Sequence, residues 1–127
     1  MDFINVTIDN HISHLFLDRG RSNALNQQML EELKQAVTTA QEDPSVEGII
    51  IQGKPGFFSA GLDLVDLYAY SEQEVRKFWY TFMDLVRTFV AFDKPAVAAI
   101  SGHSPAGGCV LALCCDYRIM ADGDYVI

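Results

Sequence analysis

The sequence predicts an α/β fold in a single domain that covers residues 1–127. Two short apolar runs, Gly48–Gln52 and Ala96–Ile100, have the length and composition of strands that other elements cover. Longer stretches between and around them repeat apolar residues every three or four positions, which is typical of amphipathic helices. With 127 residues and 50% hydrophobic content, the chain is large and apolar enough to bury one core.

The first elements are two short strands, Val6–Ile8 and His14–Leu17, which the turn residues Asp9-Asn10 connect as a hairpin. A polar loop over Asp18–Ser22 comes next. A helix then follows and ends at Asp43-Pro44. The apolar stripe of this helix consists of Leu25, Met29, Leu33, Val37 and Ala40, while Glu31, Glu32 and Lys34 lie off it.

A second long helix begins at a capping box, Ser71–Glu74, and stops at Lys94-Pro95. A short helical piece over Leu62–Tyr70 precedes it. The elements expected after Ala96–Ile100 are a buried helix over Val110–Leu113 and strands over Tyr117–Met120 and Tyr125–Ile127.

The charge balance excludes some classes of partner. A formal net charge of -8, with only 9 Lys and Arg, argues against nucleic acid or an anionic membrane surface. An anionic small ligand would need a local positive cluster, for which Arg19, Arg21 and Lys54 are candidates, although each alone fits a solvated surface charge.

Cysteine spacing and the start of the chain bear on metal binding and location. Cys109, Cys114 and Cys115 form no C-x-x-C pair, so we expect buried, reduced thiols and no metal site. The first residues do not resemble a signal or transit peptide, and no uncharged apolar run approaches about 20 residues. We therefore expect a cytoplasmic protein without a membrane span.

Two segments of small residues, Phe57–Asp63 and Ser101–Cys109, each lie between a predicted strand and a predicted helix. Small residues let the backbone approach a ligand closely, and a helix start leaves N–H groups without partners. Pro105 fits the first turn of the second helix, where Ala106-Gly107-Gly108 would present such groups. Asp63 fits a helix cap. Two N–H groups converging on one oxygen would form an oxyanion hole.

Four motifs in order resemble the crotonase (enoyl-CoA hydratase/isomerase) family. They are Asn23-Ala24-Leu25, Phe58–Leu64, Gly102–Gly108 and Cys115–Arg118. The resemblance covers essentially the whole chain and about the first half of a family member. It implies a crotonase-like spiral of repeated strand–strand–helix units, truncated before the C-terminal helical region. It also implies a trimer-based homo-oligomer for a full-length protein.

The resemblance implies a fatty acyl-CoA thioester as substrate, with coenzyme A as part of that substrate and no separate cofactor. The backbone N–H groups of Ala60 and Gly107 would form the oxyanion hole for the thioester oxygen. Substrate-binding positions implied in the same way are Ser59, Leu62, Asp63, Leu64, Pro105, Ala106 and Val110.

Val110 favours one reaction within the family. Hydratases place a glutamate at this position, because hydration needs two carboxylates around one water. Valine can do neither step of a hydration. The runs Ser104–Cys109, Leu111–Leu113 and Cys115–Arg118 resemble the delta-3, delta-2-enoyl-CoA isomerase branch of the family. This resemblance implies a double-bond shift in fatty acid β-oxidation, which needs one carboxylate. In the isomerase branch this single carboxylate is a glutamate, and the resemblance places it after the strand that begins at Tyr125, outside this chain.

Three alternatives remain open at this point: a hydratase or lyase of the same family, a non-catalytic acyl-CoA-binding fragment, and a serine hydrolase. For the last, Ser104 is followed by Pro105, and no Gly-x-Ser-x-Gly elbow is present.

Overall fold

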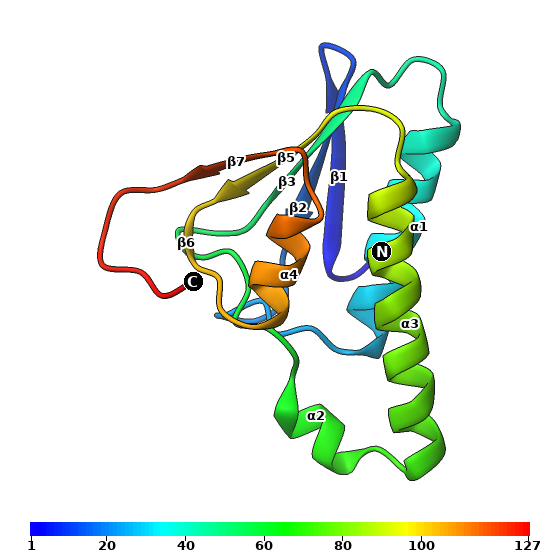
Figure 1. The fold of residues 1–127 in the computed structure, drawn as a ribbon, viewed down its shortest axis with the longest axis vertical. Coiled ribbons are helices and arrows are strands. Elements are labelled where there is room, and N and C mark those ends of the chain that lie inside the picture. Colours follow the sequence, from blue (N-terminus) through cyan, green and yellow to red (C-terminus); the bar gives the residue numbers. More distant parts are fainter.

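The computed structural model describes residues 1–127 and contains a five-stranded mixed sheet in the order β1-β2-β3-β5-β7 (Figure 1). Strands β1 (Ile4–Asp9) and β2 (Ile12–Leu17) pair antiparallel. Strands β3 (Gly48–Gln52), β5 (Ala96–Ile100) and β7 (Tyr117–Met120) continue the sheet in parallel. The predicted α/β class is confirmed.

The hairpin turn lies one residue later than predicted. Asp9 still pairs with Ile12, so the two turn residues are Asn10 and His11, with φ of 51° and 67°. Two successive positive φ values match the tight turn whose twist suits a β-hairpin.

Two long helices lie on the same side of the molecule (Figure 1). Helix α1 (Gln27–Glu42) contacts β1, β2 and β3, and α3 (Glu72–Ala91) packs against α1. The predicted capping box of α3 is present, with Ser71 and Glu74 bonding each other's backbone N–H. No helix combines the length and the apolar character that crossing a bilayer requires.

The three central strands of the sheet, β2, β3 and β5, are fully buried on one face only. Ile49 and Ile51 of β3 are at most 1% exposed, whereas Ile50 and Gln52 are half-buried. The expectation of a strand covered on both faces is therefore only partly correct. The alternation follows from the two-residue period of a strand whose one face packs on helices.

Glu32 of α1 is buried, although its place off the apolar stripe predicts a surface residue. Its carboxylate accepts the backbone N–H groups of Asp2, Phe3 and Ile4 at 2.7–3.1 Å. Burial alone raises the pKa of Glu32, but these hydrogen bonds and one from Gln28 outweigh it and lower the pKa overall. The carboxylate thus anchors the start of β1 to α1.

A second, two-stranded sheet was too short to be predicted. Strand β4 (Gly56–Phe57) follows β3, and β6 (Gly102–His103) follows β5, and the two pair in parallel. After β4 come α2 (Leu64–Ala69) and α3; after β6 comes α4 (Gly107–Leu113). The chain thus repeats a strand–strand–helix unit, as the predicted spiral requires.

The last residues do not form the predicted strand. Tyr125–Ile127 has no regular secondary structure. Val126 nevertheless donates its N–H to Nδ1 of His103 at 3.0 Å and accepts the N–H of Ser104 at 2.8 Å. The His103 ring packs between Phe57 and Tyr125, so it holds this segment in place.

Candidate active site

The parallel pairing of β4 with β6 brings the two small-residue segments together directly after these strands. Gly61 has φ of +95°, a conformation that favours glycine. A Cβ on Gly61 would lie 3.0 Å from the backbone nitrogen of Gly107 and 3.2 Å from the carbonyl oxygen of Pro105. Glycine is required here because the two backbones are already in contact.

The backbone N–H groups of the first segment differ in whether they have partners. Ala60 donates to the carbonyl of Ser22 at 2.8 Å, and Asp63 donates to the carbonyl of Leu25 at 2.9 Å. Leu62, between them, donates to no group of the protein. The predicted role of Ala60 as a free donor does not fit its hydrogen bond to Ser22.

In the second segment, the N–H of Gly107 has no partner either. Gly107 is the first residue of α4, and the cap residue Ala106 makes no side-chain hydrogen bond to the helix. A Cβ on Gly107 would lie 3.3 Å from Cδ2 of Leu62 and 3.4 Å from Cα of Gly61. Two unpaired N–H groups therefore belong to residues that contact each other.

The backbone at Ala106 is strained. Its φ of 51° and ψ of -118° fall outside the regions that residues with a Cβ ordinarily occupy. Pro105 lies before this cap rather than in the first helical turn, so the predicted position of Pro105 is wrong.

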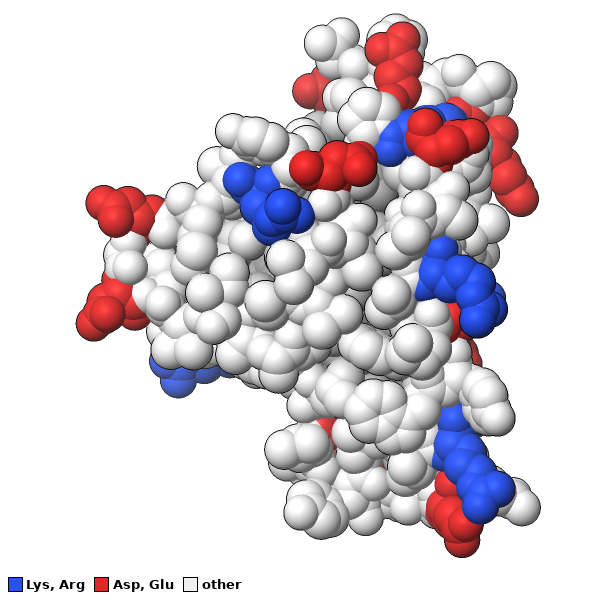
Figure 2. Space-filling view, viewed as in Figure 1, with Lys and Arg blue, Asp and Glu red and all other residues white.

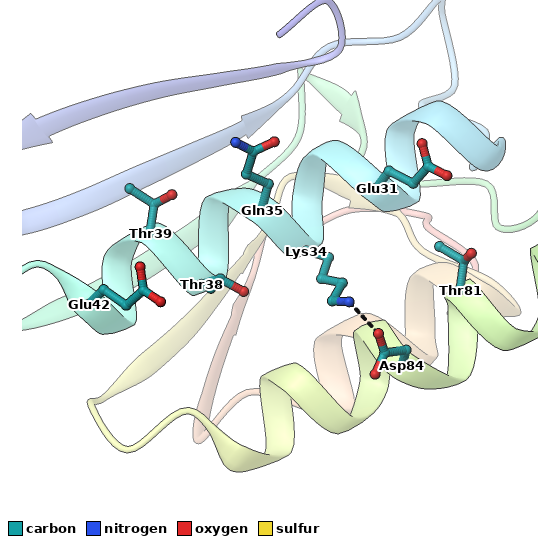
Figure 3. A pocket seen from close by; sticks show the side chains of 8 residues that line it. All are labelled: Glu31, Lys34, Gln35, Thr38, Thr39, Glu42, Thr81 and Asp84. Carbon is teal, nitrogen blue, oxygen red and sulfur yellow. Dashed lines mark hydrogen bonds and ion pairs between the residues drawn. The ribbon is translucent and has the colours of Figure 1, made fainter.

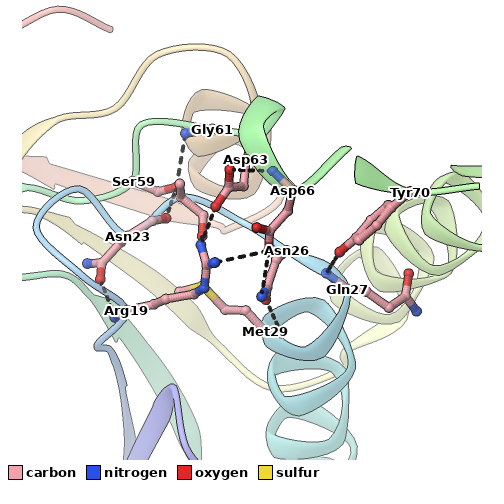
Figure 4. Close-up of polar contacts among 11 residues, drawn as sticks. Arg19, Asn23, Asn26, Gln27, Met29, Ser59, Gly61, Asp63, Asp66 and Tyr70 are labelled. Carbon is pink, nitrogen blue, oxygen red and sulfur yellow. Dashed lines mark hydrogen bonds and ion pairs between the residues drawn. The ribbon is translucent and has the colours of Figure 1, made fainter. Parts of the chain in front are cut away.

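A buried polar network supports the first segment from behind (Figure 4). Ser59 and Asn23 are each 0% exposed. The Ser59 hydroxyl donates to the carbonyl of Asn23 at 2.8 Å and accepts the N–H of Gly61 at 3.1 Å. The Ser59 side chain is therefore enclosed by protein, which does not fit its predicted contact with substrate.

Asp63 caps α2, as predicted, by accepting the N–H of Asp66. It also forms an ion pair with Arg19, whose guanidinium lies 2.7 Å from Asp63 and 3.1 Å from Asp66 (Figure 4). Burial alone raises the pKa of Asp63, but the hydrogen bonds from Arg19 and the α2 backbone outweigh it and lower the pKa. Asp63 is thus an ionised structural carboxylate.

Two of the three candidate positive residues already have carboxylate partners. Arg19 is committed to Asp63 and Asp66, and Lys54 binds Asp18 and the carbonyl of Gly20, each at 2.7 Å. Arg21 is exposed and forms no ion pair within this chain.

Apolar side chains lie exposed on the elements that follow the two segments. Leu64 and Val65 of α2 are 62% and 81% exposed, and Val110 of α4 is 37% exposed. Figure 2 shows few charged atoms over α2 and α4 on this face. These exposed apolar side chains could accommodate an apolar ligand group.

A polar surface hollow lies elsewhere, between α1 and α3 (Figure 3). An ion pair between Lys34 and Asp84 bridges the two helices across it. Its lining is entirely polar and consists of Glu31, Lys34, Gln35, Thr38, Thr39, Glu42, Thr81 and Asp84. Such a lining does not suit an acyl chain.

Burial makes two of the three cysteines poor nucleophiles. Cys115 is buried, and burial raises the pKa of its thiol to about 12. Burial also raises the pKa of Cys114. Cys109 and Cys114 are half-buried rather than fully buried, a difference from the prediction. No three His, Cys, Asp or Glu side chains are grouped so as to hold a metal ion.

Comparison with known proteins finds relatives along most of the chain. A family model described as "Enoyl-CoA hydratase/isomerase" matches residues 7–125. The chain is 41% identical over 101 residues to mitochondrial enoyl-CoA delta isomerase 1 of Mus musculus, covering 79% of this chain and 35% of the relative. It is 38% identical over 125 residues to crotonyl-CoA hydratase of Syntrophomonas wolfei, covering 95% and 48%.

Solved structures share the fold. The crystal structure of human mitochondrial delta3-delta2-enoyl-CoA isomerase superimposes with a TM-score of 0.90 at 33% identity, covering 94% of this chain and 48% of that one. An enoyl-CoA hydratase from Bacillus anthracis gives 0.89 at 31% identity, with 94% and 48% covered. This chain spans about half of each of these structures.

Proposed function

Because this chain belongs to the enoyl-CoA hydratase/isomerase family, we propose that it binds the thioester of a fatty acyl-CoA and stabilises its enolate during a double-bond shift. The observation that carries the proposal is the pair of adjacent unpaired N–H groups, at Leu62 and Gly107. Coenzyme A enters as part of the substrate, and no separate cofactor is needed.

The chemistry follows from where charge develops. When a base removes the proton next to the thioester carbonyl, the electron pair of the broken C–H bond forms a double bond to the carbonyl carbon, and the π pair of the C=O bond moves onto the oxygen. N–H groups that already point at this oxygen stabilise the resulting oxyanion more than the neutral carbonyl. One such donor contributes about 3 kcal/mol to the transition state in comparable enzymes. The proton then returns two carbons along, which completes the double-bond shift.

The proposed donors are Leu62 and Gly107. Leu62 replaces Ala60 in this role because the N–H of Ala60 is already bonded to Ser22. Gly107 keeps the role that the sequence predicts. The apolar side chains of Leu64 and Val110 lie exposed nearby and would face the acyl chain, whereas Ser59 and Asp63 serve the protein's own structure.

Two features favour isomerisation over hydration. Val110 cannot supply or accept a proton, and the Asp63 carboxylate, with its lowered pKa and its Arg19 partner, is a weak base. Hydration needs two carboxylates at one water, whereas isomerisation needs one. We propose that these 127 residues supply thioester binding and enolate stabilisation, and that a carboxylate outside them moves the proton.

A second candidate is acyl-CoA binding without turnover. It is favoured because neither Val110 nor Asp63 can act as the base beside the two donors. A hydratase of the same family remains the third, supported by the 38% identity to crotonyl-CoA hydratase.

The test uses a fatty thioester labelled with ¹³C at the carbonyl. Binding to the 127-residue chain should lower the C=O stretching frequency in isotope-edited infrared spectra, because two N–H donors polarise the bond. Free coenzyme A, which lacks the labelled thioester carbonyl, serves as the binding control. Thioester binding without a frequency shift would contradict the proposed oxyanion hole.

Turnover separates the candidates. The protein containing this chain should convert a 3-enoyl-CoA into the 2-enoyl ester and should not add water to crotonyl-CoA. Water addition would favour the hydratase, and binding with neither reaction would favour the non-catalytic module.

A further inference from the structure

We propose that Ser59, with Asn23 behind it, is a positioning residue that aims the N–H of Leu62 at the thioester oxygen. This inference rests on the proposed function, since it assigns a role in holding the donor. The Asn23-Ala24-Leu25 motif would then act by holding the donor in place, without contacting the substrate itself.

The first step is the set of hydrogen bonds on either side of Leu62. Before it, Gly61 donates its N–H to the Ser59 hydroxyl at 3.1 Å. The Gly61 carbonyl accepts the N–H of Leu25 at 2.8 Å, and after Leu62 the N–H of Asp63 returns to the Leu25 carbonyl at 2.9 Å. The peptide that carries the Leu62 N–H is therefore fixed on both sides, while its own donor stays unpaired.

The second step is the anchor for Ser59. Its hydroxyl donates to the carbonyl of Asn23 at 2.8 Å, inside the protein, where the side chain is 0% exposed. A buried hydroxyl with both a donor and an acceptor partner has little freedom to rotate. Ser59 therefore transmits the position of Asn23 to Gly61.

The third step is the anchor for Asn23. It has φ of +51°, a left-handed conformation that asparagine tolerates better than most residues. Its side chain accepts the N–H of Arg19 at 2.8 Å and donates to the carbonyl of Phe58 at 3.1 Å. Asn23 thus ties the 19–25 loop to the residue just before Ser59.

The chain offers a matched control. Ser104 is also 0% exposed and lies in the second segment, but its hydroxyl has no hydrogen-bond partner. Ser59→Ala and Ser104→Ala each delete one buried hydroxyl within the same small region. Only Ser59→Ala breaks a connection to the peptide of Leu62.

The first measurement needs no ligand. In the free 127-residue chain, Ser59→Ala should speed amide hydrogen exchange at Gly61 by about tenfold or more, because the Gly61 N–H loses one buried hydrogen bond. The same variant should shift the Leu62 amide resonance. Ser104→Ala should leave both unchanged. Unchanged exchange and resonance in Ser59→Ala would overturn the positioning role, whatever the function of the site.

The second measurement uses the ¹³C-labelled thioester. Ser59→Ala should reduce the bound carbonyl's frequency shift while affinity for free coenzyme A stays constant, and Ser104→Ala should keep the full shift. Equal shifts in both variants overturn the positioning role alone. Failure of the unmodified chain to bind the thioester overturns the proposed function and this role with it.

A second variant, Asn23→Gly, tests the same positioning role if Ser59→Ala does not fold. Glycine adopts φ of +51° freely, so this change deletes the side-chain contacts to Arg19 and Phe58 without adding backbone strain. It should reduce the carbonyl shift in the same direction as Ser59→Ala. A full shift in Asn23→Gly, with the hydrogen-bond partners lost, would overturn the role of Asn23.

Discussion

The Cα atom of Gly61 faces the backbone nitrogen of Gly107 so closely that a Cβ on Gly61 would lie 3.0 Å from it. The segments that carry these residues belong to successive units of the spiral, and the pairing of β4 with β6 brings them together. The backbone of Gly61, the residue before Leu62, therefore contacts the backbone of Gly107 directly. This contact sets the distance between the two proposed donors, the N–H groups of Leu62 and Gly107.

Gly61→Ala should weaken polarisation of a bound thioester carbonyl, because the added methyl group pushes the Gly107 nitrogen away. The matched control is Gly56→Ala: Gly56 has φ of +88°, close to the +95° of Gly61, but a Cβ there meets no atom within 4 Å. Both variants should lose about 1 kcal/mol or more of stability to backbone strain. Only Gly61→Ala should reduce the infrared shift, and equal shifts would contradict the contact argument.

Glu32→Gln should lower the free energy of unfolding by about 2 kcal/mol at pH 7, because one carboxylate oxygen that accepts backbone N–H groups becomes an NH₂ donor. Glu31→Gln is the control, since Glu31 is exposed on the same helix. Urea unfolding of both variants measures the difference.

The effect of Glu32 should depend on pH. The folded-state pKa of Glu32 is lowered, so its contribution is complete above the ordinary glutamate pKa and is lost as pH falls through the folded value. The difference between the original chain and Glu32→Gln should therefore shrink between about pH 5 and pH 3. A difference that stays constant over this range would mean that the charge of Glu32 is not what anchors β1.

Asp63→Asn should destabilise the protein by about 2 kcal/mol. Asparagine can still cap α2, so the loss reports the ion pair with Arg19, in which both side chains are less than 20% exposed. Asp84→Asn breaks the more exposed pair with Lys34 and should cost less than about 1 kcal/mol. Thermal or urea unfolding compares the two, and equal losses would argue against a special contribution from Arg19.

The thiols should react in an order set by burial. Cys115, with a pKa of about 12, should resist iodoacetamide in the folded protein at pH 8, and Cys114 should react slowly because burial raises its pKa as well. Peptide mass spectrometry with and without denaturant measures this. Rapid labelling of Cys115 in the folded state would show that the segment after α4 opens readily.

The long elements were predictable from sequence because their signals are local. The capping box of Ser71 and Glu74 marks the start of α3 within four residues, and the apolar run Gly48–Gln52 coincides with β3. The strands β4 and β6 have two residues each, so they leave no periodic pattern, and only their mutual pairing defines them. Their glycines were visible in the sequence, but what those glycines contact was not.

Part of the site depends on contacts between distant residues. The choice between Ala60 and Leu62 as donor is decided by the Ser22 carbonyl, which binds the N–H of Ala60. The burial of Glu32 is decided by the first residues of the chain, which lie against α1. Sequence spacing carries no signal for either contact, whereas the two segments that carry the proposed donors were predictable because their small residues stand out in the sequence.

The pairing of the two sheets also limits which insertions the chain can accept. Ile49 is held opposite Ala96 in one sheet and Gly56 opposite Gly102 in the other, with only the turn Gly53–Pro55 between β3 and β4. One extra residue in this turn would slide β4 by about 3.3 Å against β6 or force a bulge. The same insertion between Asp43 and Glu47 would lengthen a surface loop and leave both registers intact. Natural length variation should therefore be found in the outer loops and be excluded from this three-residue turn.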